Sequence, residues 1–218
     1  MKRSTSEFLS WTAADLFERW GAVPLDRIRV KPFPFVATEQ DVIEAQVHED
    51  RLFELVDGVL LAKTHDLHDA WLTTNLVCKL GQFVAERDFG IVLGSDGPYL
   101  FRPGHVRIPD ISFVSWNRLP KPLDPAEYFL RVAPDFVIEF VNDRNTVEEM
   151  ATKRRDYFAA GVRLLWYVYR LRQSVEVFTS DDRVRLFETG QTLGGFEVLP
   201  GFSVEVAALF EMPQRPQD

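Results

Sequence analysis

A single acidic residue, Glu139, interrupts the otherwise apolar run Phe136–Val141. Runs of this kind are typical of strands that are covered on both faces of a sheet. An ionised carboxylate in such a strand needs a cation, a hydrogen-bond network or a raised pKa, because an unpaired buried charge costs several kcal/mol or more. The environment of Glu139 in the fold must therefore supply one of these three solutions.

A second carboxylate, Asp110, lies in phase with apolar residues in the run 106–114. Side chains of a strand alternate between its faces, so Val106, Ile108 and Asp110 share one face. Pro109 has no N–H and cannot serve a hydrogen-bonded ladder on both sides, so it suits an edge, a bulge or the opening of a strand. Two predicted strands thus each carry one carboxylate in the buried phase.

A helix is predicted after the Glu139 strand. Asn145 can cap its start, with Glu148 in the reciprocal position, and Gly161 suits a left-handed terminator. Lys153 falls on or beside the inward stripe of this helix, on the same face as Met150. The pattern therefore directs a lysine toward the two carboxylates.

Two acids and a lysine on adjacent elements suit metal-assisted hydrolysis of a phosphodiester. Carboxylate oxygens hold Mg²⁺ or Mn²⁺, the ion polarises the phosphate and lowers the pKa of a bound water, and an ammonium can orient that water. A structural ion pair between Glu139 and Lys153 or Arg155 explains the same spacing, since ion networks also occupy such positions. The residues alone leave both explanations open.

The order of these residues resembles the PD-(D/E)XK restriction-endonuclease-like superfamily and, within it, the Uma-two family of endonucleases. The resemblance covers about three quarters of the chain, roughly residues 49–210. The segments that carry it are Phe53–Gly58, Arg107–Phe113, Ala133–Glu139, Lys153–Val162 and Leu199–Phe202.

The resemblance implies that Asp110 and Glu139 bind a divalent metal, Mg²⁺ or Mn²⁺, and that Lys153 is the catalytic lysine. The short motif would place the lysine two residues after the acid, where this chain has Val141. Lys153 matches relatives in which the lysine has moved onto the following helix. Glu54 also matches a family position and is expected as a third metal-assisting carboxylate, although a solvated hairpin face explains it equally well.

The resemblance implies DNA as the substrate, yet two features favour an alternative. The net charge is −8, and the chain has Asn142-Asp143 where relatives usually have Ser-Pro. An acidic balance argues against a broad nonspecific nucleic-acid surface, because phosphate binding depends largely on Lys and Arg. A noncatalytic interaction protein with a nuclease fold, or a hydrolase of another phosphate ester, therefore stays open beside the endonuclease.

The predicted fold class is α/β (α+β), with a restriction-endonuclease-like mixed sheet flanked by helices and a C-terminal β-hairpin. Residues 1–48 are expected to form an N-terminal helical extension, residues 49–211 the nuclease domain and residues 212–218 a disordered tail. Asp57-Gly58 predicts a two-residue hairpin turn. The segment 97–101 is expected to pair with a strand that begins at Gly90.

The cysteine and histidine residues limit which other kinds of site the chain can form. The lone cysteine, Cys78, excludes an internal disulfide and a cysteine-rich zinc site. His65 and His68 have a spacing that invites a zinc hypothesis, but no third ligand is evident; the family resemblance makes His68 a candidate for the rim of the site.

No apolar run reaches the ~20 residues of a membrane helix, so a cytoplasmic protein without a membrane partner is expected. Cutting both strands of a duplex would favour a two-fold homodimer.

Overall fold

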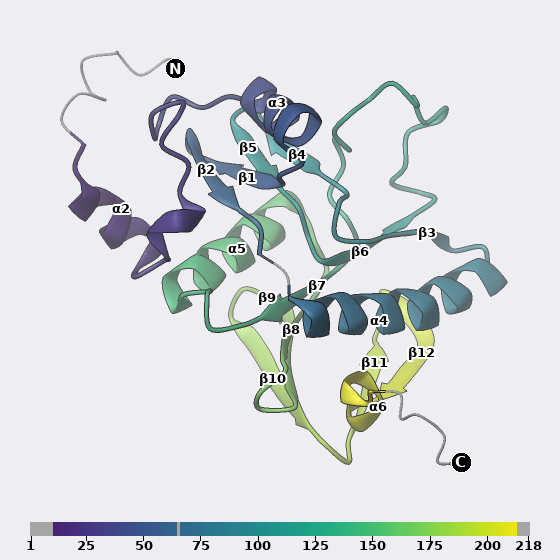
Figure 1. Ribbon diagram of the computed structural model, residues 1–218. Helices are drawn as coiled ribbons and strands as arrows, with labels where there is room; N and C mark the ends of the chain where they lie inside the picture. Colours follow the sequence, from purple (N-terminus) through teal and green to yellow (C-terminus); the bar gives the residue numbers. More distant parts are fainter. Residues whose placement is uncertain (1–10, 65, 213–218) are drawn as a thin grey trace, which may run out of the picture.

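The computed structural model describes residues 11–64 and 66–212. Its centre is a six-stranded sheet with the order β10-β9-β8-β7-β6-β3 (Figure 1). Within it, β7 and β8 run parallel and the other neighbouring strands run antiparallel, which confirms the predicted mixed sheet. The strands are β3 (Gly90–Leu93), β6 (Ile111–Ser115), β7 (Phe136–Val141), β8 (Leu164–Tyr169), β9 (Ser174–Ser180) and β10 (Arg183–Glu188).

Two helices, α4 (Leu67–Glu86) and α5 (Val147–Ala160), cover opposite faces of this sheet. The apolar stripe of α4 packs against Phe136, whereas Tyr157 of α5 packs against Val137. Strand β7 is therefore covered on both faces, which explains its apolar sequence. Because side chains alternate, the carboxylate of β7 is directed to the α5 side.

A second, four-stranded antiparallel sheet has the order β2-β1-β5-β4. The hairpin predicted at Asp57-Gly58 is confirmed, and both turn residues have positive φ, 50° and 79°. Helix α3 (Glu39–Glu49) packs on one face of the sheet, and Trp20 packs on the other. The strands are β1 (Phe53–Val56), β2 (Val59–Ala62), β4 (Tyr99–Arg102) and β5 (His105–Arg107).

The two sheets meet where the run 106–114 divides. Its first part is β5 in the small sheet and its second part is β6 in the central sheet, with Pro109 between them. This agrees with the prediction that Pro109 suits the opening of a strand. Asp110 consequently lies at the junction of the two sheets.

The predicted partner of the segment 97–101 is wrong. Strand β4 pairs with β5, and β3 pairs with β6. Strands β4 and β5 are joined by the turn Pro103-Gly104, in which Gly104 has φ 75°. A tight turn makes the pairing of its own flanking strands the shortest closure, so the local hairpin forms in preference.

The predicted start of α5 is also wrong by one residue. Thr146 is the N-cap, and its hydroxyl accepts a hydrogen bond from the Glu149 N–H at 3.0 Å. Asn145 lies outside the helix, where its side chain joins the preceding loop to the helix. The predicted end is confirmed, because Gly161 is the C-cap with φ 103°.

The described part of the N-terminal extension, residues 11–48, contains helices, as predicted. Thr12 and Thr38 form capping boxes with Asp15 and Asp41 at the starts of the two α-helices described within residues 11–48. A short 3₁₀ helix, η1 (Leu25–Arg27), lies between α2 (Ala13–Trp20) and α3.

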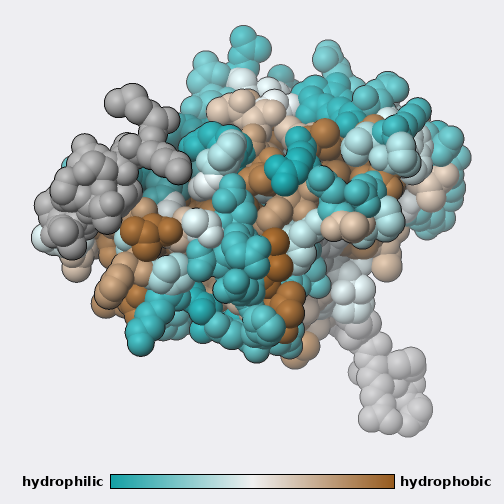
Figure 2. All heavy atoms as spheres, turned by 90° about the horizontal axis from the view of Figure 1, so that it is seen from above, coloured by the Kyte–Doolittle hydropathy of each residue, from teal (hydrophilic) through white to brown (hydrophobic). Residues whose placement is uncertain are grey.

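The C-terminal part adds the predicted hairpin β9–β10 and a smaller two-stranded sheet that sequence patterns did not predict. These further elements are β11 (Thr192–Gly195), β12 (Leu199–Glu205) and α6 (Val206–Phe210). Apart from residue 212, the predicted disordered tail lies outside the described residues. No helix within the described part of the chain has the length and apolarity needed to cross a membrane. The face seen in Figure 2 is largely hydrophilic, with small apolar patches scattered over it.

Candidate active site

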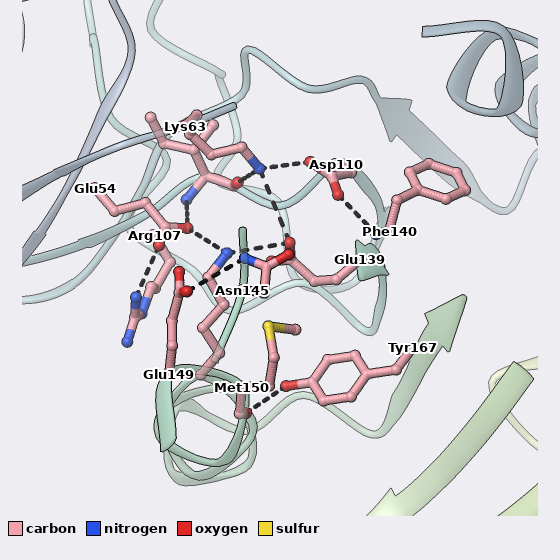
Figure 3. Close-up of polar contacts among 12 residues, drawn as sticks. Glu54, Lys63, Arg107, Asp110, Glu139, Phe140, Asn145, Glu149, Met150 and Tyr167 are labelled. Atoms are coloured by element: carbon pink, nitrogen blue, oxygen red, sulfur yellow. Dashed lines mark hydrogen bonds and ion pairs between the residues drawn. The ribbon is translucent and has the colours of Figure 1, made fainter. Parts of the chain in front are cut away.

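The two predicted acids, Asp110 and Glu139, converge on one position. Both are buried, with 4% and 2% of their surface exposed. Asp110 Oδ2 accepts a hydrogen bond from the Phe140 N–H at 2.7 Å, and Glu139 Oε1 accepts one from the Tyr157 hydroxyl. The other oxygens, Asp110 Oδ1 and Glu139 Oε2, face the ammonium of Lys63 at 2.5 and 3.9 Å (Figure 3).

The predicted lysine and the predicted third carboxylate join the same cluster. Lys153 Nζ lies 3.1 Å from Glu139 Oε2 and 3.2 Å from Glu54 Oε1. Glu54 Oε2 binds Arg107 Nη1 at 2.8 Å, and Glu54 Oε1 accepts a hydrogen bond from the Ile108 N–H at 3.1 Å. Both oxygens of Glu54 are thus bound by protein groups. The structure brings all four predicted site residues together.

The cluster borders a small cavity of about 20 Å³. A space of this size admits about one water molecule or ion. A larger hollow of about 470 Å³ lies beside the proline-rich segment 120–132, but its walls are mainly apolar. Ionisable groups therefore identify the site better than volume does. The small cavity is lined by Arg27, Lys63, Thr64, Asp110, Glu139, Phe140, Asn145 and Lys153.

Lys63 was not predicted as a site residue, although the hairpin contained the signal. The turn at residues 57–58 places Glu54 opposite Leu61, and the Lys63 N–H donates to the Leu52 carbonyl at 3.0 Å. Opposed residues of an antiparallel pair share a face, and so do residues two apart along a strand. Extending the register by two residues would have placed Lys63 on the face of Glu54.

Arg27 is a second site residue that was not predicted, and it comes from the N-terminal extension. Its two Nη atoms bind the Glu149 carboxylate at 2.8 and 2.7 Å. The same guanidinium donates to the carbonyls of Ala62 at 3.0 Å and Arg144 at 2.8 Å. Arg27 and Glu149 are 122 residues apart in the chain, so no local pattern could have revealed the pair.

Burial and charge act against each other on Glu139 and Lys63. Burial raises the pKa of Glu139, and the nearby carboxylates add to this, so its pKa is raised despite the attraction of the lysines. Burial opposes the charge on Lys63, but attraction to Asp110 and Glu139 outweighs it and raises the pKa of the amine. Lys63 is therefore held as an ammonium.

The pKa values of Glu54 and Glu149 are lowered, whereas that of Glu139 is raised. Burial opposes their ionisation, but neighbouring cations outweigh it and lower both pKa values. Lys153 and Arg107 are the main cations for Glu54, and Arg27 is the main one for Glu149. Both carboxylates are stabilised as anions by the fold.

Acid should consequently destabilise the protein. The pKa values of Glu54 and Glu149 lie below the ordinary 4.5, so their contribution is fully present above that pH and is lost as the pH falls through the folded-state values. Each group should lower the free energy of unfolding by roughly 1.4 kcal/mol per pH unit in that window. Glu139 has a raised pKa and therefore has the opposite effect above pH 4.5. As the pH falls toward 4.5, protonation of the buried Glu139 increases the free energy of unfolding.

Urea titrations between pH 7 and 3 measure this free energy directly. We expect a decline below about pH 4.5, and a shallower decline in Glu149→Gln, which removes one of the titrating groups. An unfolding free energy that stays constant down to pH 3 would contradict the assigned charge states.

The site contains oxygen atoms of the kind that bind a hard cation, but they do not form a complete set of metal ligands. Across residues 11–64 and 66–212, no group of three or more His, Cys, Asp or Glu side chains is arranged to hold a metal ion. His65 lies outside the described residues, and His68 is exposed at the start of α4. The candidate donors are therefore one oxygen each from Asp110 and Glu139, with the carbonyl of Ile108 beside them.

Comparisons with known proteins agree with this architecture. Residues 39–207 match the model of the Uma2 family, described as "Putative restriction endonuclease". The crystal structure of "a putative nuclease belonging to DUF820" from Anabaena variabilis ATCC 29413 matches with a TM-score of 0.66 at 18% identity, over 74% of this chain and 90% of that chain. At this identity the likeness shows the fold. No curated protein matches the sequence significantly. Because the family model spans most of the chain, the protein belongs to the Uma2 family.

Proposed function

We propose that the protein is a metal-dependent endonuclease that hydrolyses DNA phosphodiester bonds. The observation that carries this proposal is the convergence of one oxygen each from Asp110 and Glu139 on a single cation position beside Lys153. Membership of a family described as restriction endonucleases supports the reaction class.

The residues present fit a divalent ion. Asp110 Oδ1, Glu139 Oε2 and the Ile108 carbonyl surround a position that already holds a positive charge, that of Lys63. Oxygen donors of this kind suit Mg²⁺ or Mn²⁺. When bound, such an ion supplies polarisation of the phosphate and a water of lowered pKa.

The protein groups around the position keep its donors in place. The Phe140 N–H holds Asp110 and the Tyr157 hydroxyl holds Glu139, each through the oxygen that faces away from the cation position. Fixed second partners of this kind orient metal-binding carboxylates and are important for affinity. The strand β7 therefore supplies both a ligand and the backbone that orients the other ligand.

Lys153 supplies the positive charge beside the reacting phosphate. It lies between Glu139 and Glu54, where its ammonium can orient the attacking water or offset the negative charge that develops on the phosphate. Glu54 is itself fixed by Arg107 and the Ile108 N–H. We propose that Glu54 positions Lys153; the metal-assisting role expected from the family resemblance stays a prediction.

A cleavage assay on several substrates tests the proposal. Covalently closed plasmid, single-stranded DNA, single-stranded RNA and a small phosphodiester are incubated with Mg²⁺, Mn²⁺ or a chelator. We expect nicked or linear plasmid only when metal is present, because a closed circle has no ends for an exonuclease.

The other outcomes separate the alternatives. Hydrolysis of the small ester without any cutting of nucleic acid would indicate a different phosphate-ester hydrolase. No turnover of any substrate would favour the noncatalytic interaction protein. Linear plasmid as the first product, together with a dimer in sedimentation, would support the proposed two-fold homodimer, whereas nicked circles and a monomer would contradict it.

A further inference from the structure

We propose that Lys63 is a resident cation that occupies the metal position in the metal-free protein and must be displaced before a divalent ion binds. This inference rests on the proposed metal site. It assigns a role to a residue that lies within the cluster but belongs to neither of the predicted metal-binding strands.

Lys63 Nζ contacts two oxygens of the kind that bind a hard cation, and a third such oxygen lies nearby. Its Nζ lies 2.5 Å from Asp110 Oδ1, 2.6 Å from the Ile108 carbonyl and 3.9 Å from Glu139 Oε2. Two carboxylate oxygens and a carbonyl are also the ligands that a hard divalent ion takes. The side chain is only 6% exposed, so this position is inside the protein and is not a surface encounter.

In the metal-free protein this ammonium compensates buried negative charge. Asp110 and Glu139 are buried next to each other, and buried carboxylates without compensating charge are strongly destabilising. Lys153 compensates Glu139 and Glu54 from the α5 side. Lys63 adds a positive charge from the opposite side, beside Asp110.

An ammonium and a divalent ion cannot share the position. Like charges about 4 Å apart repel by about 1 kcal/mol even in bulk water, and more strongly in a buried site. Lys63 follows β2, and its backbone N–H is tied to Leu52, so displacement requires movement of the side chain alone. The flexible four-carbon stem of lysine permits such a movement.

Competition with Lys63 reduces the apparent metal affinity to the intrinsic affinity multiplied by the fraction of time the position is open. If the position is open for less than about a tenth of the time, the apparent Kd for the ion is raised at least about tenfold. Lys63 would thereby set the metal concentration at which the site becomes loaded. Binding of metal and release of Lys63 are one linked event.

Calorimetric titration with Mn²⁺ tests this role in the native protein, in Lys63→Met and in Lys79→Met. Methionine keeps most of the stem but removes the charge, and Lys79 is an exposed lysine on α4 that serves as the matched control. We expect the Kd for Mn²⁺ to fall at least about tenfold in Lys63→Met and to stay unchanged in Lys79→Met. An equal or weaker Mn²⁺ affinity in Lys63→Met would overturn the inference.

Thermal unfolding provides a second readout that does not depend on cleavage. The metal-free Lys63→Met protein should unfold at a lower temperature than the native protein, and Mn²⁺ should raise its Tm by more. If Lys63→Met fails to fold without metal, Lys63→Gln is used in its place, since the glutamine amide can still donate a hydrogen bond to Asp110. The Kd for Mn²⁺ and the Tm with and without Mn²⁺ are then compared between Lys63→Gln and the native protein.

Failure of this inference can be told apart from failure of the proposed function. If the native protein and Lys63→Met bind Mn²⁺ equally and both cut DNA, the proposed function stands and the role of Lys63 falls. If neither binds Mn²⁺ at millimolar concentration, both fall. Asp110→Ala in the Lys63→Met background should abolish the tighter binding, and retained binding would place the ion elsewhere and overturn the inference.

Discussion

Asp110→Ala is expected to lower metal-dependent DNA cleavage by roughly 1000-fold or more. Metal-assisted stabilisation of a phosphoryl transition state contributes several kcal/mol, and every ~1.4 kcal/mol corresponds to a factor of ten in rate. Asp110 supplies one of the two carboxylate oxygens at the cation position, and its other oxygen is held by Phe140. Plasmid cleavage at saturating Mn²⁺, followed over time, measures the change.

Two further variants make this result specific. Lys153→Ala should also lose cleavage but retain Mn²⁺ binding, because its ammonium contacts Glu139 and Glu54 and is not itself a donor to a metal. Asp96→Ala, which removes an exposed carboxylate between β3 and β4, should cut as fast as the native protein. Equal cutting by all the variants would assign the activity to a contaminant.

Arg27→Met should destabilise the fold by about 3–5 kcal/mol, because it leaves the carboxylate of Glu149 buried without its partner. Arg27 is 4% exposed and gives hydrogen bonds to Glu149 and to two carbonyls from other parts of the chain. For a domain of this size the loss corresponds to a decrease in Tm of roughly 6–20 °C. Denaturant unfolding at pH 7 measures it.

Arg29→Met is the matched control for this variant. Arg29 also makes a two-pronged ion pair, with Glu49, but that pair is exposed to solvent and its loss should change the Tm little. The double variant Arg27→Met/Glu149→Leu should recover part of the stability, since it removes the unpaired charge as well. An Arg27→Met protein as stable as Arg29→Met would contradict the account of this pair.

Arg27 belongs to the N-terminal extension, yet it lies at the candidate site. The family match begins at residue 39, after Arg27, and the predicted extension ends at residue 48. Yet Arg27 lines the same cavity as Asp110 and Lys153. The extension therefore contributes a wall of the candidate site as well as the packing of Trp20 on the small sheet.

The sequence was most informative where a charge broke an apolar pattern. Glu139 in β7 and Lys153 on the inward face of α5 were predictable because period two and period 3.6 each assign a face from the residues alone. Asp110 and Glu54 were identified by phase and by family resemblance. Each of these four residues lies in the cluster that the structure shows.

What could not be predicted depended on contacts between distant segments. Arg27 meets Glu149 only after the extension has packed against α5, and no periodicity encodes that approach. The run 106–114 has the alternation of one strand but is divided between two sheets, because Pro109 ends one ladder before the next begins. Lys63 was an intermediate case, since the hairpin register was predictable but was not followed past Ala62.

Anomalous diffraction from a crystal grown with saturating Mn²⁺ tests the central claim most directly, because it locates the ion without reference to activity. We predict a manganese peak within about 2.0–2.6 Å of both Asp110 Oδ1 and Glu139 Oε2, with the ammonium of Lys63 moved out of that position. A fully occupied peak elsewhere, or no peak while Lys63 still lies between the two carboxylates, would contradict a metal-dependent nuclease centre at this site.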